Sequence, residues 1–537
     1  MSSKRFGIIV FIVVLALTVF AWSNRFIQDD AFISFRYADN LVRGNGLVWN
    51  PGERVEGYTN FLWTLIMAVP LALGADPIVF SFVLGFLCFA LTLVVTLKCA
   101  SFVCGSRFLS VLAVIFLGLN YSFSAYATGG LETQFQTFLL ISCIYLTLLS
   151  IRRNEWPVHR LLGLSFLHAA AILTRPDSVI LATVCTITTL FYLFRRDPGR
   201  ERRYGNTAAF LLPVLLVVGG WTVWRVSYYG EFLPTPYLVK ACSAPSLHRG
   251  AHYIYSFLYS YWLLPVIAIG IITGGRLVKK LNPAVTILFV VVFLWIIYVI
   301  RVGGDFMEYR LLVPVLPLAF ILVTWTIDNA IENRPLQAAL VALVVAGSIH
   351  HSLTFENSAV RWGITPIRWL HKQVNDTDGG WAGIGRTLGI AFDGNRDITI
   401  ATTASGAIPY YSRLITVDML GLNDRWVACH GDVLSTRPGH QRLAPLRYLV
   451  DRHVSLVIGH PWVVTAEDMN PHRTCYAAGE LERMAIRDLV GLPDGSKILE
   501  IPIDRNRTLI AVYLHDNPLI NKLIREHDWH IYPVCKG

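Results

Sequence analysis

Long apolar segments constrain the fold of this chain more than any other feature. Its 537 residues are 54% hydrophobic and only 15% charged, whereas a soluble domain carries about 25% charged residues. A helix of about 17–25 apolar residues is long enough to cross a bilayer. We therefore expect an α-helical polytopic membrane protein with about eleven transmembrane helices. The expected spans lie near residues 6–24, 77–97, 108–126, 133–150, 161–174, 178–194, 207–226, 254–273, 283–300, 311–327 and 335–353.

The basic residues predict how these helices are oriented. Lys and Arg gather in cytoplasmic loops, and this accounts for the net charge of +10 without a nucleic-acid partner. The basic clusters are Arg152–Arg153, Arg195–Arg203 and Arg276–Lys280. All of them lie inside if the short run Phe61–Leu73, which contains Pro70, is a juxtamembrane or re-entrant segment and not a span. We therefore predict a multi-pass protein of the cell inner (plasma) membrane, with a cytoplasmic N-terminus and an extracytoplasmic C-terminus.

The chain changes character after residue 353. Residues 354–537 are more polar, and at about 180 residues they suffice for an independent domain. Short apolar runs typical of strands occur at Ile398–Ala401, Leu414–Val417, Val454–Ile458 and Leu509–Tyr513. Ser405–Tyr411, between the first two runs, predicts a β-α-β unit. We expect a transmembrane catalytic domain at 1–353, with its first outer loop at 25–76, and an extracytoplasmic α/β domain at 354–537.

The cysteines and the missing motifs limit the chemistry. Four of the nine cysteines fall on the side expected to be oxidising, where disulfides are allowed: Cys242, Cys429, Cys475 and Cys535. A pair such as Cys429–Cys475 is one candidate. No Cys/His spacing is typical of zinc, and no glycine-rich motif is typical of nucleotide binding. These absences favour a donor carried by a lipid. No essential cofactor or metal is expected, and a divalent cation stays an alternative.

The first outer loop carries the candidate catalytic residues. The stretch Gln28–Trp63 follows the first apolar segment and opens with two adjacent acids, Asp29 and Asp30. Sugar transfer from a polyprenyl phosphate needs a carboxylate that takes the proton of the attacking hydroxyl. Asp is also favoured as a helix cap. We expect one of the two acids to cap or orient and the other to catalyse, with a slight preference for Asp30 as the base.

Further polar residues from separate outer loops are candidates for binding the substrate. Arg and Lys can neutralise a leaving phosphate in a dry site, and acids and Asn can hold sugar hydroxyls. The candidates are Arg36, Glu56, Tyr58, Asn60, Glu132, Arg175, Asp177, Lys240, Asp305 and Arg310. Structural alternatives stay open for several of them. Arg175 could anchor a helix end, Arg310 could pair with Asp305, and Glu56 with Tyr58–Asn60 could fix the juxtamembrane helix.

A family resemblance rests on five motifs taken together. They read DDAFISFRYADNLVRGNGLVWNPGERVEGYTNFLW, GGLE, TRPD, GGDFMEYR and VDMLGLND. Over most of its length the chain resembles the terminal β-(1→2)-arabinofuranosyltransferases of actinobacterial cell walls, within the GT-C superfamily. The resemblance implies an inverting transfer from a polyprenyl-phosphate sugar, arabinofuranose among the candidates, to a cell-surface glycan at the outer membrane face. It also implies a catalytic Asp in the first outer loop, and so supports Asp29 or Asp30.

Two other classes of function stay open. A flippase or transporter of lipid-linked saccharides would also need many helices, but it is expected to show broken mid-membrane segments and internal repeats. Neither is evident, because the charges gather on one side. A non-catalytic envelope-glycan assembly protein would explain an outer domain with tryptophans that could stack on sugars: Trp381, Trp426, Trp462 and Trp529. It would not explain the acid-rich first loop.

Overall fold

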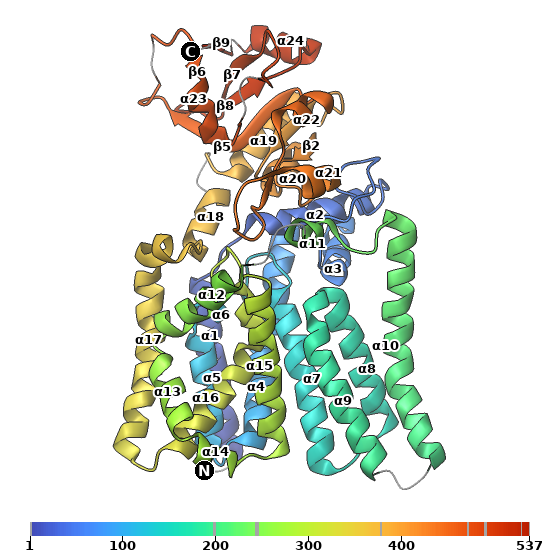
Figure 1. Cartoon of the computed structure of the whole chain (residues 1–537), viewed down its shortest axis with the longest axis vertical. Coiled ribbons are helices and arrows are strands. Elements are labelled where there is room, and N and C mark those ends of the chain that lie inside the picture. The colour runs from blue at the N-terminus through green and yellow to red at the C-terminus, as the bar shows by residue number, and fades with distance from the viewer. Residues whose placement is uncertain are drawn as a thin grey trace.

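The protein consists of a helical bundle and a sheet-containing domain stacked on one end of it. The computed structural model describes residues 3–196, 200–241, 246–375, 379–469, 472–487, 491–527 and 529–535. In Figure 1 the N-terminus lies at the lower end of the bundle and the C-terminus at the top of the sheet-containing domain. Short helices fill the junction between the two parts.

The long apolar segments form the helices of the bundle. Eight helices of the described chain are long and apolar enough to cross a membrane, or nine if a pair bent by 100° counts as one span. This makes the chain a multi-pass membrane protein. The long helices are α1 (Ser3–Ser23), α4 (Pro77–Val103), α7 (Thr133–Arg153), α9 (Val179–Arg196), α10 (Arg200–Tyr229), α15 (Pro283–Arg301), α16 (Leu316–Ala330) and α17 (Arg334–Trp362). The spans of α9 and α16 include the short helical turns that precede them, so that they begin at Pro176 and Arg310. The bent pair is α12 (Leu247–Ser260) with α13 (Leu264–Ile272).

The expected count of eleven spans is not confirmed. The two further expected spans correspond to the apolar helices α5 (Arg107–Leu119) and α8 (Val158–Thr174). With 13 and 17 residues, they are about 20 and 26 Å long at 1.5 Å per residue, shorter than a hydrocarbon core of about 30 Å. Both stand within the bundle in Figure 1.

Short helices form the junction. They include α2 (Asp29–Val42), α3 (Phe61–Ala72) and α11 (Thr235–Ala241). Helix α3 has 12 residues and is about 18 Å long, so it cannot cross the bilayer alone, in agreement with the expected juxtamembrane segment. Other short elements connect the long helices: α6 (Tyr121–Ala125), η1 (Pro176–Ser178), α14 (Gly274–Val278) and η2 (Arg310–Val315).

The C-terminal domain contains a mixed sheet of seven strands in the order β2-β1-β5-β8-β7-β9-β6. Its strands are β1 (Thr399–Thr402), β2 (Ile415–Asp418), β5 (Leu456–Thr465), β6 (Tyr476–Ala477), β7 (Lys497–Pro502), β8 (Arg507–Tyr513) and β9 (Ile531–Cys535). Strands β1 and β2 pair in parallel and flank α20 (Ala407–Ser412), so the predicted β-α-β unit is confirmed. The predicted runs at β5 and β8 are confirmed as well, and these two strands pair antiparallel.

Helices cover the sheet and bury both of its faces. They are α19 (Trp381–Phe392), α21 (Arg425–His430), α22 (Leu446–Asp451), α23 (Ala478–Leu481), η3 (Glu482–Met484) and α24 (Pro518–Glu526). Helix α18 (Ile367–Asn375) packs its apolar residues into the core of the bundle instead. Strands β3 (Asp432–Val433) and β4 (Arg442–Leu443) form a separate pair. Alternate residues of a strand point to opposite faces. Accordingly, Ile498 and Leu499 of β7 belong to two different apolar clusters.

One disulfide lies in this domain, and it is not the suggested one. Cys475 is bonded to Cys535, which ties the start of β6 to the end of β9. The suggested partner Cys429 lies on α21, and because Cys475 is bonded to Cys535, the pair Cys429–Cys475 is wrong. Cys242 lies outside the described residues.

Candidate active site

Asp29 and Asp30 have different environments although they are adjacent. Asp29 is buried, and its carboxylate oxygens accept hydrogen bonds from the backbone N–H groups of Ala407 (2.7 Å) and Gly406 (3.0 Å). A Cβ at Gly406 would lie 1.9 Å from the backbone oxygen of Asp29, so the contact requires glycine. Burial raises the pKa of Asp29 to about 7, against the effect of the two backbone hydrogen bonds. Asp29 therefore joins α2 to the start of α20.

Asp30 is accessible and lies beside a cation. Its side chain keeps 30% of its surface exposed, and Oδ2 lies 3.6 Å from Nη1 of Arg310. Burial raises the pKa of Asp30, and the charge of Arg310 opposes this rise. The cap of α2 is neither acid but Gln28, whose side-chain oxygen accepts the N–H of Asp30 at 2.5 Å. The carboxylate of Asp30 is thus left for a role other than capping.

Arg310 links two acids from separate segments. It begins η2, and its Nε donates to Oδ2 of Asp305 at 2.9 Å while Nη1 faces Asp30. The other oxygen of Asp305 accepts the N–H of Phe306 at 2.8 Å. This arrangement fixes the guanidinium next to the partly exposed carboxylate of Asp30.

A second cation holds two further predicted acids. Arg175 forms ion pairs with Glu132 (2.9 Å) and with Asp177 (3.0 Å). The second oxygen of Glu132 accepts the side-chain N–H of Asn60 at 2.7 Å. Glu132, Arg175, Asp177 and Arg310 all line one small cavity. The two arginines therefore belong to a single charged cluster.

The turn before Glu132 explains how this acid reaches the cluster. Glu132 is the N-terminal cap of α7 and follows a turn in which Gly129 and Gly130 both have positive φ. A Cβ at Gly130 would lie 2.6 Å from the Cβ of Ala31 in α2. Only glycine allows the turn to pack this closely under α2, and so the GGLE motif sets Glu132 below the helix of Asp30.

Lys240 adds a third cation. It lies on α11, and its charge interacts with those of Asp305, Asp177, Arg310 and Arg175. Burial lowers its pKa. Among the residues that the structure describes, none forms a hydrogen bond or a close ion pair with its ammonium.

Three of the predicted residues, Arg36, Glu56 and Tyr58, form contacts outside the charged cluster. Arg36 stacks on Trp49 and donates to backbone oxygens of Trp49 (2.7 Å), Pro409 and Leu414 (2.8 Å), so it binds the first loop to the C-terminal domain. Glu56 pairs with Arg225 of α10 at 2.8 Å.

Tyr58 shares a hydrogen bond of 3.0 Å with Tyr229, also of α10. Glu56 and Tyr58 therefore attach the first loop to α10. The partner in both contacts is α10, and not the juxtamembrane helix that the structural alternative named.

Sequence reasoning missed two residues that orient Asp177. Gln136 of α7 donates to its Oδ1 at 2.6 Å, and the Tyr298 hydroxyl of α15 donates to its Oδ2 at 3.3 Å. Gln136 is a polar residue inside an apolar helix, and such residues are usually functional. That signal could have identified it. Tyr298 offers no comparable signal, because Tyr is common in membrane helices.

One further buried pair was not expected. His351 is completely buried, and its Nε2 lies 2.8 Å from Glu308. Its ring also stacks on the ring of Tyr261 at a centroid distance of 4.1 Å.

The whole-chain fold matches a solved membrane protein. ArnT from Cupriavidus metallidurans, solved bound to undecaprenyl phosphate, superimposes with a TM-score of 0.54 over 95% of this chain and 98% of that one. The chain has the GT-C fold. At 12% sequence identity the likeness establishes the fold alone. The charged cluster described above therefore lies in a GT-C bundle, at the end that the C-terminal domain covers.

Sequence relatives agree with the resemblance drawn from the motifs. The chain is 28% identical over 388 residues to the terminal β-(1→2)-arabinofuranosyltransferase of Corynebacterium glutamicum, covering 64% of this chain and 54% of that protein. It is 27% identical over 334 residues to the enzyme of the same name from Mycobacterium tuberculosis, covering 54% and 51%. The matched region thus spans about half the length of these relatives. Residues 368–521 also match a family described as a domain of unknown function, DUF8728.

The described residues contain no group of three or more His, Cys, Asp or Glu side chains placed to hold a metal ion. The acids of the cluster are paired with arginines instead. Among the described residues, the positive charges of the site are those of Arg175, Lys240 and Arg310.

Proposed function

We propose that this protein is a membrane glycosyltransferase that moves a sugar from a polyprenyl-phosphate donor to a glycan acceptor. The observation that carries the proposal is the accessible carboxylate of Asp30, held 3.6 Å from Arg310 at the edge of a cluster of acids and cations. The GT-C fold and the named relatives support the same class of reaction. Arabinofuranose is the proposed sugar, since both relatives are arabinofuranosyltransferases.

Asp30 is the proposed general base. The acceptor hydroxyl gives its proton to Asp30 while its oxygen forms a bond to the anomeric carbon of the donor sugar. The bond from that carbon to the phosphate oxygen breaks at the same time, so the configuration inverts. A positioned base of this kind accelerates such a reaction by about 10²–10⁴. The raised pKa of Asp30 makes its carboxylate a better proton acceptor than an ordinary exposed Asp.

The cations of the cluster are proposed to bind the phosphate. Negative charge grows on the leaving phosphate as the bond breaks, and fixed cations in a site with little water stabilise it. Lys240 suits this role because none of the described residues pairs with its ammonium, and its charge interacts with that of Arg310, which faces the base. Arg175, held by Glu132 and Asp177, adds positive charge beside the same cavity. We propose that these side chains suffice without a metal ion.

The remaining features of the proposal concern location. We propose that the C-terminal domain and the charged cluster face the outside of the inner (plasma) membrane. The N-terminus would then be cytoplasmic and the acceptor a cell-surface glycan. The positions of Arg152, Arg153 and Arg276 support this orientation, since Figure 1 has the helix ends that carry them at the end of the bundle opposite the C-terminal domain.

The test is transfer by the purified protein. Wild type, Asp30→Asn and the control Asp39→Asn would be offered polyprenyl-phosphate arabinofuranose, glucose and mannose, with a synthetic arabinofuranosyl oligosaccharide as acceptor. Asp39 lies on the same helix, and its ion pair among the described residues is with Arg43. We expect Asp30→Asn to lose at least about 100-fold in rate and Asp39→Asn to match wild type. Product formation should persist in EDTA. Full activity of folded Asp30→Asn, or no transfer from any donor, would contradict the proposal.

A further inference from the structure

A second polar cavity lies in the C-terminal domain, away from the charged cluster. It measures about 360 Å³, within the range of about 300–1,000 Å³ typical of small-molecule sites. Its walls come from β5, β6, β7 and the segment around α23, and of these strands β7 and β6 lie in the half of the sheet away from β2. Helix α20, which Asp29 contacts, lies at the β2 edge. Figure 1 shows β6, β7 and α23 in the upper part of the C-terminal domain, away from α2, the helix of Asp30 at the junction with the bundle. The cavity is therefore separate from the cluster around Asp30.

A buried carboxylate forms part of this cavity. Glu500 of β7 is only 3% exposed, and its Oε1 accepts the hydroxyl proton of Tyr476 at 2.6 Å. Its second oxygen, Oε2, has no hydrogen-bond partner among the described residues. Burying a carboxylate oxygen without a partner is costly. A ligand hydroxyl that donates to Oε2 would remove this cost.

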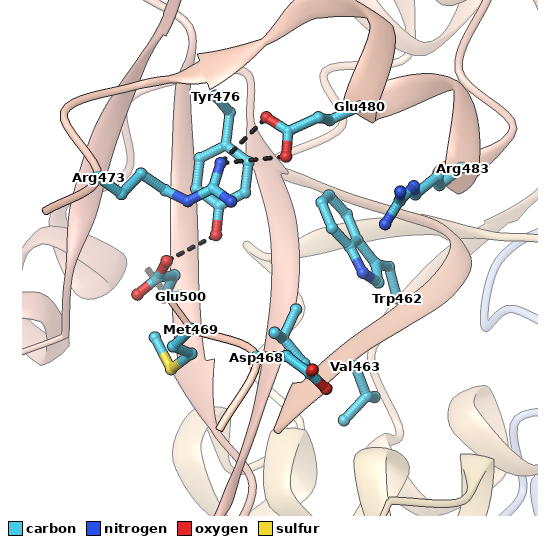
Figure 2. A pocket seen from close by; sticks show the side chains of 10 residues that line it. Trp462, Val463, Asp468, Met469, Arg473, Tyr476, Glu480, Arg483 and Glu500 are labelled. Atoms are coloured by element: carbon cyan, nitrogen blue, oxygen red, sulfur yellow. Dashed lines mark hydrogen bonds and ion pairs between the residues drawn. The ribbon is translucent and has the colours of Figure 1, made fainter. Parts of the chain in front are cut away.

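Two aromatic rings and two arginines stand around the carboxylate. Trp462 and Tyr476 meet edge to face with centroids 5.8 Å apart. Arg473 lies over the ring of Tyr476 at 3.8 Å and pairs with Glu480 at 3.0 Å, while Arg483 lies over Trp462 at 5.4 Å. Figure 2 shows these side chains gathered from three segments around the cavity.

The wall that carries Tyr476 is covalently fixed. Cys475, the residue before it, is bonded to Cys535 at the end of β9. Strand β9 pairs in turn with β7, which carries Glu500. The hydroxyl of Tyr476 and the carboxylate of Glu500 are therefore held in place before any ligand binds. Such preorganisation reduces the entropy lost on binding.

The chemistry of the lining selects the class of ligand. Three carboxylates (Asp468, Glu480 and Glu500) face two guanidinium groups (Arg473 and Arg483). The excess of negative charge disfavours phosphates and other anions. Hydrogen-bond donors and acceptors alternate around aromatic surface, and this suits a neutral molecule with many hydroxyl groups and apolar C–H faces. Sugars have both properties.

We propose that this cavity is a second glycan-binding site, which holds a neutral segment of the acceptor at a distance from the reacting end. Trp462 supplies the apolar surface for a sugar ring, and Glu500 accepts a sugar hydroxyl. The identification of the ligand as acceptor glycan rests on the proposed function. The binding of a neutral oligosaccharide itself does not.

The test is binding by the full chain in lipid nanodiscs, without donor and in the Asp30→Asn background. The probe is a synthetic arabinofuranosyl pentasaccharide with a photoreactive diazirine, and crosslinked peptides are mapped by mass spectrometry. We expect crosslinks within residues 462–500. We also expect Trp462→Ala and Glu500→Gln each to weaken this labelling about tenfold or more, because each removes a direct contact. Trp369→Ala, which alters a tryptophan that is 53% exposed on α18 and does not line the cavity, should change nothing.

Two results would overturn the proposal. One is labelling confined to peptides of the bundle. The other is labelling of 462–500 that inorganic phosphate displaces but unlabelled pentasaccharide does not, which would make the cavity an anion site. Glu500→Gln keeps the shape of the side chain. If Trp462→Ala does not fold, the labelling of residues 462–500 in Glu500→Gln therefore tests the proposal. Since no turnover is involved, failure of this proposal and failure of the proposed transferase activity are separate outcomes.

Discussion

Asp29 and Asp30 share a peptide bond but bind partners from different parts of the protein. Asp29 accepts hydrogen bonds from Gly406 and Ala407 in the C-terminal domain, whereas Asp30 faces Arg310 in the helical bundle. The first turn of α2 is therefore fixed from both sides. This relationship separates the structural acid from the proposed base, a distinction that two adjacent identical residues do not reveal in sequence.

Replacing Asp29 should destabilise the protein. Asp29→Ala leaves two buried N–H groups without an acceptor, at about 1–3 kcal/mol each, so the free energy of unfolding should fall by about 2–6 kcal/mol. Thermal unfolding followed by tryptophan fluorescence measures this change. The matched variant Asp39→Ala removes only a partly exposed pair with Arg43 and should cost less than about 1 kcal/mol. Equal melting temperatures for the two variants would show that the Asp29 contact contributes little.

The pH dependence of transfer should report on Asp30. The base must be unprotonated, so the rate should fall as the pH drops through the raised pKa of Asp30. The charge of Arg310 lowers this pKa. Arg310→Gln should therefore raise the pKa further and move the acid limb of the kcat/KM profile to higher pH. Arg310→Lys keeps the charge and should move it less. If the acid limb of the kcat/KM profile does not move in Arg310→Gln, the group that titrates there is not Asp30.

Arg175 should matter through its geometry as well as its charge. Removing one partner of a buried ion pair costs about 3–5 kcal/mol, and Arg175→Ala would leave Glu132 and Asp177 facing each other without a cation. We expect a large loss of thermal stability. Arg175→Lys keeps the charge but cannot bind both acids in the same fork, so it should fold and transfer slowly. A fully active Arg175→Lys variant would contradict this role.

The disulfide should stabilise the C-terminal domain. Cys475 and Cys535 are 60 residues apart, and closing a loop of that length contributes about 4 kcal/mol in the chain-entropy description. The double variant Cys475→Ser/Cys535→Ser should be cleaved faster by trypsin within residues 472–535. Transfer at the Asp30 site should change little. Cleavage at the wild-type rate would show that the domain does not depend on this bond.

The sequence predicted the parts of the fold that have strong local signals. The β-α-β unit at 399–418 was predicted because two apolar runs flank a short segment with turn residues. Strands β7 and β9 were missed: β7 ends in Pro502 and β9 contains Pro533, and proline argues against a strand in sequence. The disulfide could not be assigned either, because the partner of Cys475 depends on the pairing of β6 with β9.

The sequence predicted the charged cluster for a similar reason. Glu132, Asp177 and Arg310 all lie near the ends of helices on one side of the bundle, so topology alone brought them together. The hydrogen-bond partners of Arg36 could not be predicted in this way. Its acceptors Pro409 and Leu414 are 373 and 378 residues away in the chain, and no local pattern connects residues at that separation.

The loop that carries Asp30 also carries the contacts to the C-terminal domain. Arg36 binds the carbonyl oxygens of Pro409 and Leu414, and the side-chain amide of Asn50 binds both backbone groups of Thr416 in strand β2. The first outer loop therefore forms a unit with the C-terminal domain, although the two are more than 300 residues apart in sequence. A hybrid enzyme that exchanges C-terminal domains between homologues should exchange residues 25–60 together with them. A junction placed only after α17 would combine an outer domain with a loop that was not selected to fit it.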